Sequence, residues 1–385
     1  MRYQHQEPPA TTARRITPLT VKLQNKIASR GSISVAAYVD ACLMDAEEGY
    51  YIHSPAIGAE ADFVTAPEIS QIFGELIGVW SAVVWQHMGS PGQLNLLELG
   101  PGRGTLMVDL LRAFAKVPKL AEALHVHLLE INPTLRQQQE NVLKHRAARL
   151  THHANPTSLC DIARETDVPW IVIGNEFLDA QGVRQLVSQN GKWHERTVEC
   201  AANGELMFGV GEAVKEHFSN WPDAANRPDG QIFETIPALG NSVAPLLQAL
   251  THRSPVACLF IDYGHVQTAV GETLQAMRRH AYEHPLTSPG EADLTVHVDF
   301  AEVACALQRA GLIPHAVLSQ AEFLGRLGIV ERTSHLMAAN SARAAELESA
   351  TMRLMAPNGM GSRFKAIAGC SPQLLPLPIF DCISR

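Results

Sequence analysis

The sequence has little charge, few aromatics and no long apolar run, and the lack of an apolar run excludes a class of protein. Only 18% of its residues are charged and 6% are aromatic. No stretch approaches the roughly 18 consecutive apolar residues that a membrane span needs. The first fifteen residues lack the apolar centre of a secretory signal. We therefore expect no membrane span, and we favour the cytoplasm.

Basic clusters and paired cysteines are also missing. The net charge is −8, so the phosphates of a nucleic acid would be repelled overall, which argues against a general nucleic-acid binder. A negative field would instead attract a basic protein or peptide. The seven cysteines are scattered, odd in number and without paired spacing. This pattern indicates reduced thiols and no disulfide framework.

What is present is enough apolar sequence, 46% of 385 residues, for a full core and two or three domain-sized units. We predict a flexible N-terminus at 1–16 and a mainly helical region at 17–90. A core follows in two parts, at 91–182 and 256–385, the second with C-terminal helices. Between the two parts, 183–255 changes to an antiparallel and helical insertion that we interpret as a substrate lid.

Strands and helices alternate from Asn95 onward, which predicts an α/β fold with a doubly wound, mostly parallel, Rossmann-like sheet. Hairpin turns are expected at Asn190-Gly191 and Asn203-Gly204. A capping box of Thr65 and Glu68 predicts one helix running on through Trp80. Further elements are expected as strands near 95–99, 125–130, 149–153, 170–173, 256–262 and 313–318, an edge strand at 364–368 and a helix over 338–355.

The chain is organised around a strand, a tight turn and a helix, which read LLELGPGRGTLMVDLLRAF from Leu96 to Phe114. Gly100, Gly102 and Gly104 carry no Cβ, so the backbone can take positive φ and a ligand can lie against it. The helix that follows offers unpaired N–H groups and a partial positive charge. This loop is suited to the anionic end of a small molecule.

The spacing of the glycines decides between two cofactors. A dinucleotide fingerprint is G-x-G-x-x-G, whereas this loop is G-x-G-x-G preceded by Glu98. That form is typical of S-adenosylmethionine sites in doubly wound methyltransferases. Glu130, at the tip of the next strand, can accept hydrogen bonds from two ribose hydroxyls. S-adenosylmethionine is the expected cofactor, and a NAD-dependent oxidoreductase is the less favoured alternative.

The best catalytic candidates follow the strand at 170–173. Asn175, Glu176 and Asp179 should border the ligand crevice, because the carboxyl ends of parallel strands meet at one edge. Paired carboxylates can hold a guanidinium group by bidentate hydrogen bonds and can accept its proton. We assign Glu176 and Asp179 to catalysis and substrate binding, and Asn175 to substrate and cofactor binding. The alternative is that Glu176 merely caps the following helix.

A second set of candidates ends the strand at 256–262. Tyr263 offers a hydroxyl to the substrate, and His265 is a candidate general base near neutral pH, although a structural hydrogen-bonding role is equally open. His297 and Asp299 lie two residues apart as a metal pair could, but no third ligand has suitable spacing. No metal is expected.

Together these residues resemble the MidA-like methyltransferases, which include a mitochondrial complex I assembly-factor methyltransferase and bacterial relatives. The resemblance covers roughly residues 20–370 and rests on long motifs: GSISVAAYVDACL, DFVTAPEISQIFGELIG, LLELGPGRGTLMVDLLRA, NEFLDA, FIDYGH and PGEADLTVHVDF. It implies an S-adenosylmethionine-dependent fold, cofactor contacts at the three glycines and Glu130, and arginine methylation of a respiratory complex I subunit.

The chain departs from the family at the acidic loop. Leu178 stands where the family has a second aromatic residue, and Gln181-Gly182 where it has leucine-proline. Glycine frees φ where proline fixes it, so we expect a looser loop. We predict a protein-arginine methyltransferase, with a homodimer possible. The alternative from another class is an assembly factor that binds S-adenosylmethionine without turnover.

Overall fold

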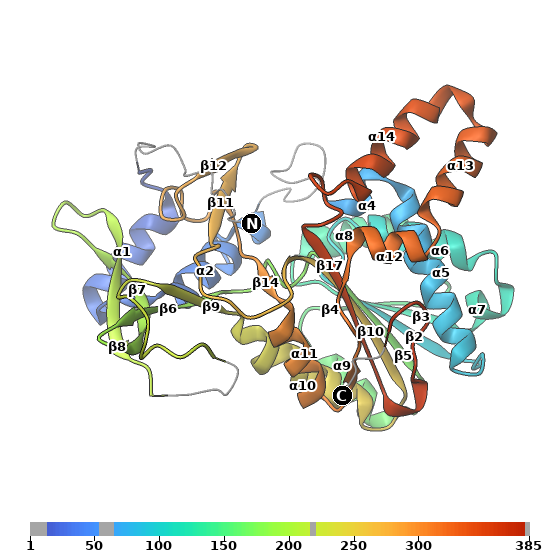
Figure 1. Ribbon diagram of the computed structural model, residues 1–385, viewed down its shortest axis with the longest axis horizontal. Helices are drawn as coiled ribbons and strands as arrows, with labels where there is room; N and C mark the ends of the chain where they lie inside the picture. Colours follow the sequence, from blue (N-terminus) through green and yellow to red (C-terminus); the bar gives the residue numbers. More distant parts are fainter. Residues whose placement is uncertain (1–13, 54–64, 216–220, 382–385) are drawn as a thin grey trace. The chain divides into compact units, whose positions relative to one another are not determined.

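The computed structural model describes residues 14–53, 65–215 and 221–381. The chain forms two compact units (Figure 1). The larger unit contains the described residues of Val64–Leu178, Ala238–Gln267 and Val298–Arg385. The smaller unit contains those of Met1–Phe63, Asp179–Pro237 and Thr268–His297. The bounds of these two units differ from those of the five predicted regions. The N-terminal segment groups with the segments that follow Leu178 and Gln267. The role of 183–255 as a lid stays a prediction.

A nine-stranded sheet, counted over the described residues, forms the centre of the larger unit. Its main path runs β15-β17-β10-β5-β2-β3-β4, with β14 beside β10 and β16 beside β17. The five strands from β10 to β4 are parallel to their neighbours, and β17 is antiparallel to β10. The bounds of the five parallel strands are β2 Leu94–Leu99, β3 Leu124–Leu129, β4 Leu150–His153, β5 Trp170–Asn175 and β10 Val256–His265. The expected doubly wound α/β fold is confirmed.

The central strands are buried on both faces, which explains their nearly continuous apolar sequence. All six residues of β2 are buried, Glu98 included. Leu96, Val126 and Ile171 point to the face that α5 and α6 cover, and they join the main hydrophobic core with Phe73, Trp80 and Phe114. Burying a large apolar side chain of this kind contributes about 1.5–3 kcal/mol. The buried sheet therefore holds the carboxyl ends of its parallel strands in place, and the residues of the candidate site follow these ends.

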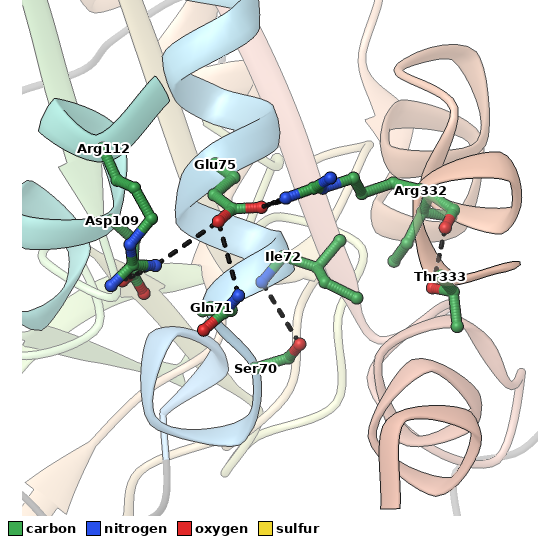
Figure 2. Close-up of polar contacts among 9 residues, drawn as sticks. Ser70, Gln71, Ile72, Glu75, Asp109, Arg112, Arg332 and Thr333 are labelled. Atoms are coloured by element: carbon green, nitrogen blue, oxygen red, sulfur yellow. Dashed lines mark hydrogen bonds and ion pairs between the residues drawn. The ribbon is translucent and has the colours of Figure 1, made fainter. Parts of the chain in front are cut away.

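The predicted helix from Thr65 to Trp80 is two helices, and this prediction was wrong at Ser70. The helices are α4 Ala66–Ile69 and α5 Gln71–His87. Ser70 has extended backbone, and its hydroxyl accepts a hydrogen bond from the Ile72 N–H at 3.2 Å (Figure 2). Thr65 makes no side-chain cap. Glu68 is engaged elsewhere, because its Oε1 accepts a hydrogen bond from Thr105 at 2.6 Å.

A buried carboxylate fastens α5 to two other helices of the larger unit, α6 Thr105–Phe114 and α13 Ile329–Ala339. Glu75 is 6% exposed. It accepts two hydrogen bonds from Arg332, at 2.8 and 3.0 Å, and one from Arg112 at 3.4 Å (Figure 2). Arg112 also pairs with the buried Asp109 at 2.7 Å. Charged groups are buried only when paired in this way.

The other helices of the larger unit follow the parallel strands in sequence or belong to the C-terminal part of the chain. α10 packs on both α9 and α11. Asp299 caps α11, since its Oδ1 accepts hydrogen bonds from the N–H groups of Ala301 and Glu302. The bounds are α7 Pro118–Ala123, α8 Pro133–Leu143, α9 Thr157–Glu165, η1 Leu239–Val243, α10 Ala244–Thr251, α11 Phe300–Arg309, α12 Gln320–Arg326, η2 Ser341–Arg343, α14 Ala344–Met355 and η3 Pro372–Leu374.

Three predictions in the C-terminal part were wrong in detail. The sixth strand is two short pieces, β15 Ile313–Pro314 and β16 Leu318–Ser319. Both pair with β17 Phe364–Cys370, which therefore lies inside the sheet and is not an edge strand. The helix over 338–355 is the end of α13, a 3₁₀ turn and α14, and the two helices project as a hairpin (Figure 1).

The smaller unit is built on antiparallel sheets. The first sheet has the order β1-β7-β6-β9 with β8 beside β7, and the second has the order β12-β11-β13. The Asn190-Gly191 turn joins β6 to β7 as predicted, with both residues at positive φ. The bounds are α1 Pro18–Arg30, β1 Ile33–Ser34, α2 Val35–Met44, α3 Tyr50–His53, β6 Arg184–Gln189, β7 Lys192–Cys200, β8 Leu206–Ala213, β9 Ile232–Thr235, β11 Gln275–Arg278, β12 Ala281–Glu283, β13 Asp293–Thr295; β14 Val298–Asp299 belongs to the larger unit.

Candidate active site

The order of the strands defines where a ligand would bind in the larger unit. From β2 the chain moves outward through β3 and β4, then returns to β5 on the other side of β2. The crevice at the carboxyl ends of β2 and β5 is therefore a topological switch point, the usual ligand position in doubly wound sheets. The glycine loop follows β2, and Asn175 ends β5. The two predicted motifs thus follow neighbouring strands.

The glycine loop has the backbone conformation that its sequence predicts. Gly100, Gly102 and Gly104 have φ values of 62°, 53° and 82°, all in the left-handed region. A Cβ on Gly100 would lie 3.0 Å from the Phe177 ring. Gly104 is the N-cap of α6 and supplies no side-chain hydrogen bond to the helix. The first N–H groups of α6 are therefore available to an anionic group of a ligand.

Glu130 directly follows β3 and is held on both of its oxygens. It is 7% exposed. Its Oε1 accepts a hydrogen bond from the Asn132 N–H at 2.8 Å, and its Oε2 accepts one from Gln139 Nε2 at 3.3 Å. Burial raises the pKa of Glu130, and these hydrogen bonds oppose that rise. The backbone N–H of Gly102 also hydrogen-bonds to this carboxylate, which links Glu130 directly to the glycine loop.

Glu98 is the next-to-last residue of β2, two residues before Gly100. It is 3% exposed. Burial, followed by the nearby charge of Glu130, raises the pKa of Glu98 to about 8. Its Oε2 has no hydrogen-bond partner among the residues that the structure describes. A buried polar atom without a partner is unusual, and a bound ligand with a polar group would satisfy it. The loop, Glu98 and Glu130 fit an S-adenosylmethionine molecule.

The acidic turn after β5 is strained at its predicted catalytic residue. Glu176 has φ of 48°, which is uncommon for a residue with a side chain. Its Oε1 accepts hydrogen bonds from the Ala66 N–H at 3.0 Å and from Asn175 Nδ2 at 3.3 Å. Asp262 accepts a hydrogen bond from the Leu178 N–H at 2.9 Å and so holds the turn. Glu176 therefore does cap a helix, but this helix is α4; the expected following helix is not present, since the next element after the turn is the strand β6.

Asp179 belongs to the smaller unit, three residues after Glu176 in the chain. It is 7% exposed. Burial, then the charges of Asp293 and Asp179, raises the pKa of Tyr51 well above its ordinary value. The Tyr51 hydroxyl donates to Asp293 at 2.8 Å. In the same unit the Asp40 carboxylate fills the space that a Cβ on Gly182 would need, with 2.0 Å to its Oδ1.

Tyr263 and His265 lie within the last residues of β10, because this strand extends beyond the predicted end at Asp262 to His265. Tyr263 pairs with Phe364 of β17, and their ring centroids are 5.4 Å apart. His265 Nε2 lies 3.9 Å from Asp299 Oδ2. Burial lowers the pKa of His265, and Asp299 partly offsets this. Within 14–53, 65–215 and 221–381, no group of three or more His, Cys, Asp or Glu is placed to hold a metal.

Two contacts near the loop were not predicted from the sequence. Gln139 donates to the Gly102 carbonyl at 2.6 Å as well as to Glu130. Thr105, the first residue of α6, donates to Glu68 of α4. A signal for Gln139 was present in the sequence, because it repeats at a spacing of four with Leu135 and Leu143, the buried face of α8. Nothing local in the sequence pairs Thr105 with Glu68.

Fold and site together define an enzyme of the doubly wound class that binds a nucleoside cofactor, and comparison with known proteins narrows the class. Residues 76–317 match the family model described as "Putative S-adenosyl-L-methionine-dependent methyltransferase". The chain belongs to this family of methyltransferases, and its cofactor is S-adenosylmethionine. The predictions of the family, the methyltransferase class and the cofactor are confirmed.

The named relatives cover most of the chain. It is 34% identical over 377 residues to "Protein arginine methyltransferase NDUFAF7 homolog, mitochondrial" of Drosophila melanogaster, with 91% of this chain and 84% of that protein covered. It is 31% identical to the Homo sapiens "Protein arginine methyltransferase NDUFAF7, mitochondrial", with 92% and 83% covered. Both names say mitochondrial, so the prediction of a cytoplasmic location was wrong. Address signals are read by receptors, and neither composition nor fold reveals them.

A solved structure shows the same fold. A "likely methyl transferase" from Burkholderia thailandensis, bound to S-adenosyl-homocysteine, superposes with a TM-score of 0.78 at 26% identity and covers 96% of this chain and 97% of its own. S-adenosyl-homocysteine is the demethylated form of the cofactor. A membrane-spanning helix needs both length and apolar character. In the part of the chain that the structure describes, no helix is both long and apolar enough to cross a membrane.

Proposed function

We propose that this methyltransferase modifies a guanidinium nitrogen of arginine in a protein substrate. The observation that carries the proposal is the acidic turn. It places Glu176, in a left-handed conformation, directly after β5 and beside the strand that carries the glycine loop. The names of the relatives, protein arginine methyltransferases, support the same substrate class. Strained residues of this kind cluster at functional sites.

The cofactor would be held by the residues at the switch point. The N–H groups at the start of α6 and the glycine loop suit its carboxylate, and Glu130 suits its ribose hydroxyls. Glu98 and Asn175 line the same strand ends. When bound, the cofactor supplies a methyl group on a positively charged sulfur. The chain itself must hold the acceptor nitrogen in line with that group, because alignment contributes most to a displacement of this kind.

The acids have two tasks toward an arginine. A guanidinium group stays protonated in water, with a pKa above about 12, so carboxylates must localise its charge and take up the proton that methylation releases. We assign both tasks to Glu176 and Asp179. Tyr263 is assigned to substrate binding. His265, whose pKa burial lowers, is neutral at pH 7 and can accept that proton in turn.

Two finer expectations belong to this proposal. The family resemblance points to a subunit of respiratory complex I as the substrate, and the net charge of −8 is compatible with a basic protein. A homodimer stays a prediction, which light scattering of the purified full-length chain would test. The insertion at 183–255 stays a predicted lid.

Transfer of a labelled methyl group tests the proposal. The full-length protein is incubated with radiolabelled S-adenosylmethionine and a mitochondrial extract, and the labelled amino acid is identified after hydrolysis. We expect methylarginine, and Glu176→Gln should reduce transfer by about a hundredfold or more while cofactor binding persists. Glu165→Gln, at an exposed acid of α9, should have no effect. Label on lysine, or equal transfer by Glu176→Gln, would contradict the proposal.

One observation favours the non-catalytic alternative. Glu176 already accepts hydrogen bonds from Ala66 and Asn175, so it must share or exchange these donors to hold a guanidinium group. A protein that binds S-adenosylmethionine tightly but labels nothing in the extract would be an assembly factor that retains the fold without turnover.

A further inference from the structure

Gln139 is a fully buried polar residue on an otherwise apolar helix face. The buried face of α8 consists of Leu135, Gln139 and Leu143, and Gln139 is 0% exposed. Its neighbours Gln137 and Gln138 are exposed. Burial of an amide is costly unless its hydrogen bonds are made. The position of Gln139 therefore depends on what its side chain contacts.

The side chain of Gln139 connects the two halves of the cofactor site. Its Nε2 donates to the Gly102 carbonyl at 2.6 Å and to Glu130 Oε2 at 3.3 Å. An amide nitrogen carries two hydrogens, so one group serves both acceptors. The carbonyl of Gly102 can only accept, which fixes which end of the amide faces it. The Cγ of Gln139 also lies 3.5 Å from where a Cβ on Gly104 would be.

The orientation of this amide leaves its oxygen unpaired, a cost in free energy that an apolar residue at the same position would avoid. With Nε2 on the two acceptors, Gln139 Oε1 is buried without a hydrogen-bond partner among the described residues. Leucine or methionine would fill the same position on the apolar face without an unpaired oxygen. The retained amide is explained if its two donated hydrogen bonds hold the loop and Glu130 in one arrangement.

We propose that Gln139 is a positioning residue for the cofactor, which sets the glycine loop at Gly102 and the ribose-binding carboxylate of Glu130 at a fixed separation. The inference rests on the assignment of both residues to the cofactor site. Without the amide, two ends of the site lose their common partner. The loop and the carboxylate then keep only the direct contact through the Gly102 backbone, so their separation is less fixed and the cofactor has to order them on binding.

A second consequence concerns protonation. The hydrogen bond from Gln139 favours the charged form of Glu130 against the effect of burial. Its removal raises the pKa of Glu130 further. Because only the ionised carboxylate accepts hydrogen bonds from both ribose hydroxyls, cofactor affinity should then begin to fall at a higher pH. A role confined to packing would leave this pH profile unchanged.

The test compares Gln139→Met with Gln138→Met by calorimetric titration of the full-length protein with S-adenosylmethionine between pH 5 and 8. For Gln139→Met we expect about tenfold weaker binding at pH 7.5 and a shift of the affinity profile to higher pH by about half a unit or more. Gln138→Met, one residue away and exposed, should match the wild type. Wild-type affinity and an unshifted profile for Gln139→Met would overturn the inference.

Two further variants keep the result clear. Gln139→Asn, which retains an amide but is shorter by one methylene, replaces Gln139→Met if that variant does not fold. Glu130→Gln tests the site itself. If Glu130→Gln leaves S-adenosylmethionine binding unchanged, the assignment of the cofactor site is wrong. If Glu130→Gln weakens binding while the Gln139 variants do not, only the proposed role of Gln139 is wrong.

Discussion

The carboxyl group of Glu98 is buried in an environment that strongly disfavours its charged form. Its raised pKa, about 8, means that the native state keeps a proton which the unfolded chain loses near 4.5. The stabilisation is complete below about pH 4.5 and is lost as pH rises toward 8. At neutral pH Glu98 is therefore mostly protonated and can donate a hydrogen bond.

Replacement of Glu98 by glutamine should remove this pH dependence. We expect the cofactor-free wild type to lose thermal stability between pH 6 and 8.5, and Glu98→Gln to lose less over the same interval, because the amide does not titrate. Melting temperatures followed by circular dichroism measure both. Parallel curves for the two proteins would show that Glu98 is not protonated in the native state.

The loop glycines give a second prediction at this scale. Gly100→Ala should cost about 1–2 kcal/mol of stability through its positive φ, and its Cβ would also press on the Phe177 ring at 3.0 Å. We expect the resulting shift of the loop to weaken S-adenosylmethionine binding at least about tenfold.

Gly89→Ala is the matched control. Gly89 has φ of 87°, and a Cβ there would meet nothing within 4 Å. The variant should lose comparable stability but bind the cofactor as the wild type does. Equal binding by both variants would mean that the loop does not contact the cofactor.

Single residues of the site could be predicted where a residue type suited to the ligand stands at the spacing of a known motif. The glycines and Glu130 follow from a motif and a strand end, and the structure gives both the expected geometry. Gln139 was missed because a glutamine on a helix is usually exposed, and the strain at Glu176 cannot be seen in the sequence because φ is set by Asp262 and Ile261, which are distant in the chain.

Among the elements, α5 is held by the contacts of Glu75. Glu75→Gln would remove the charge that Arg112 and Arg332 share, and it should destabilise the protein by about 1–3 kcal/mol, less than for a fully buried pair since both arginines reach solvent. The measurement is urea unfolding. Glu346→Gln, which breaks the exposed pair with Arg343, should have no measurable effect. Equal midpoints for both variants would contradict a structural role for Glu75.

A ladder of imidazoles links three strands of the large sheet. His127 lies between Asn95 Oδ1, at 3.2 Å, and His153, at 3.0 Å, and His153 contacts Ser158 at 2.7 Å. Burial lowers the pKa of His127 to about 3 and that of His153 to about 4. Charges on His125 and Arg149 act on His127 in the same direction. The native state thus keeps both rings neutral.

The ladder should make the protein sensitive to acid. Stability is complete above about pH 6.5 and falls as pH drops toward 4, because the unfolded chain binds protons that the native state does not. His153→Gln should show a smaller loss of melting temperature between pH 7 and 5 than the wild type. An identical loss would indicate that the ladder does not resist protonation.

Elements were predicted best where periodicity is strong and worst where tertiary pairing decides. The buried strands β2, β5 and β10 and the hairpin at Asn190-Gly191 follow from local sequence. The break at Ser70 was missed because Thr65 and Glu68 have the spacing of a capping box for one helix, whereas Glu68 accepts a hydrogen bond from Thr105. The position of β17 inside the sheet depends on β15 and β16, which are two residues each and too short for a pattern.

At the scale of the whole molecule, the fold class and the family were predictable because the motifs are long and the alternation of strands and helices is regular. The grouping of the N-terminal segment with residues after Leu178 was not, since it depends on pairings such as β1 with β7, separated by more than 150 residues. The compartment was predicted wrongly, because no physical property of the fold carries it.

The central claim is that the glycine loop and Glu130 together bind S-adenosylmethionine. A crystal structure of the full-length protein with S-adenosylhomocysteine tests this most directly. We predict density for the ligand along Gly100–Gly104, with both ribose hydroxyls on the carboxylate of Glu130. A ligand bound elsewhere, with the loop and Glu130 untouched, would contradict the account.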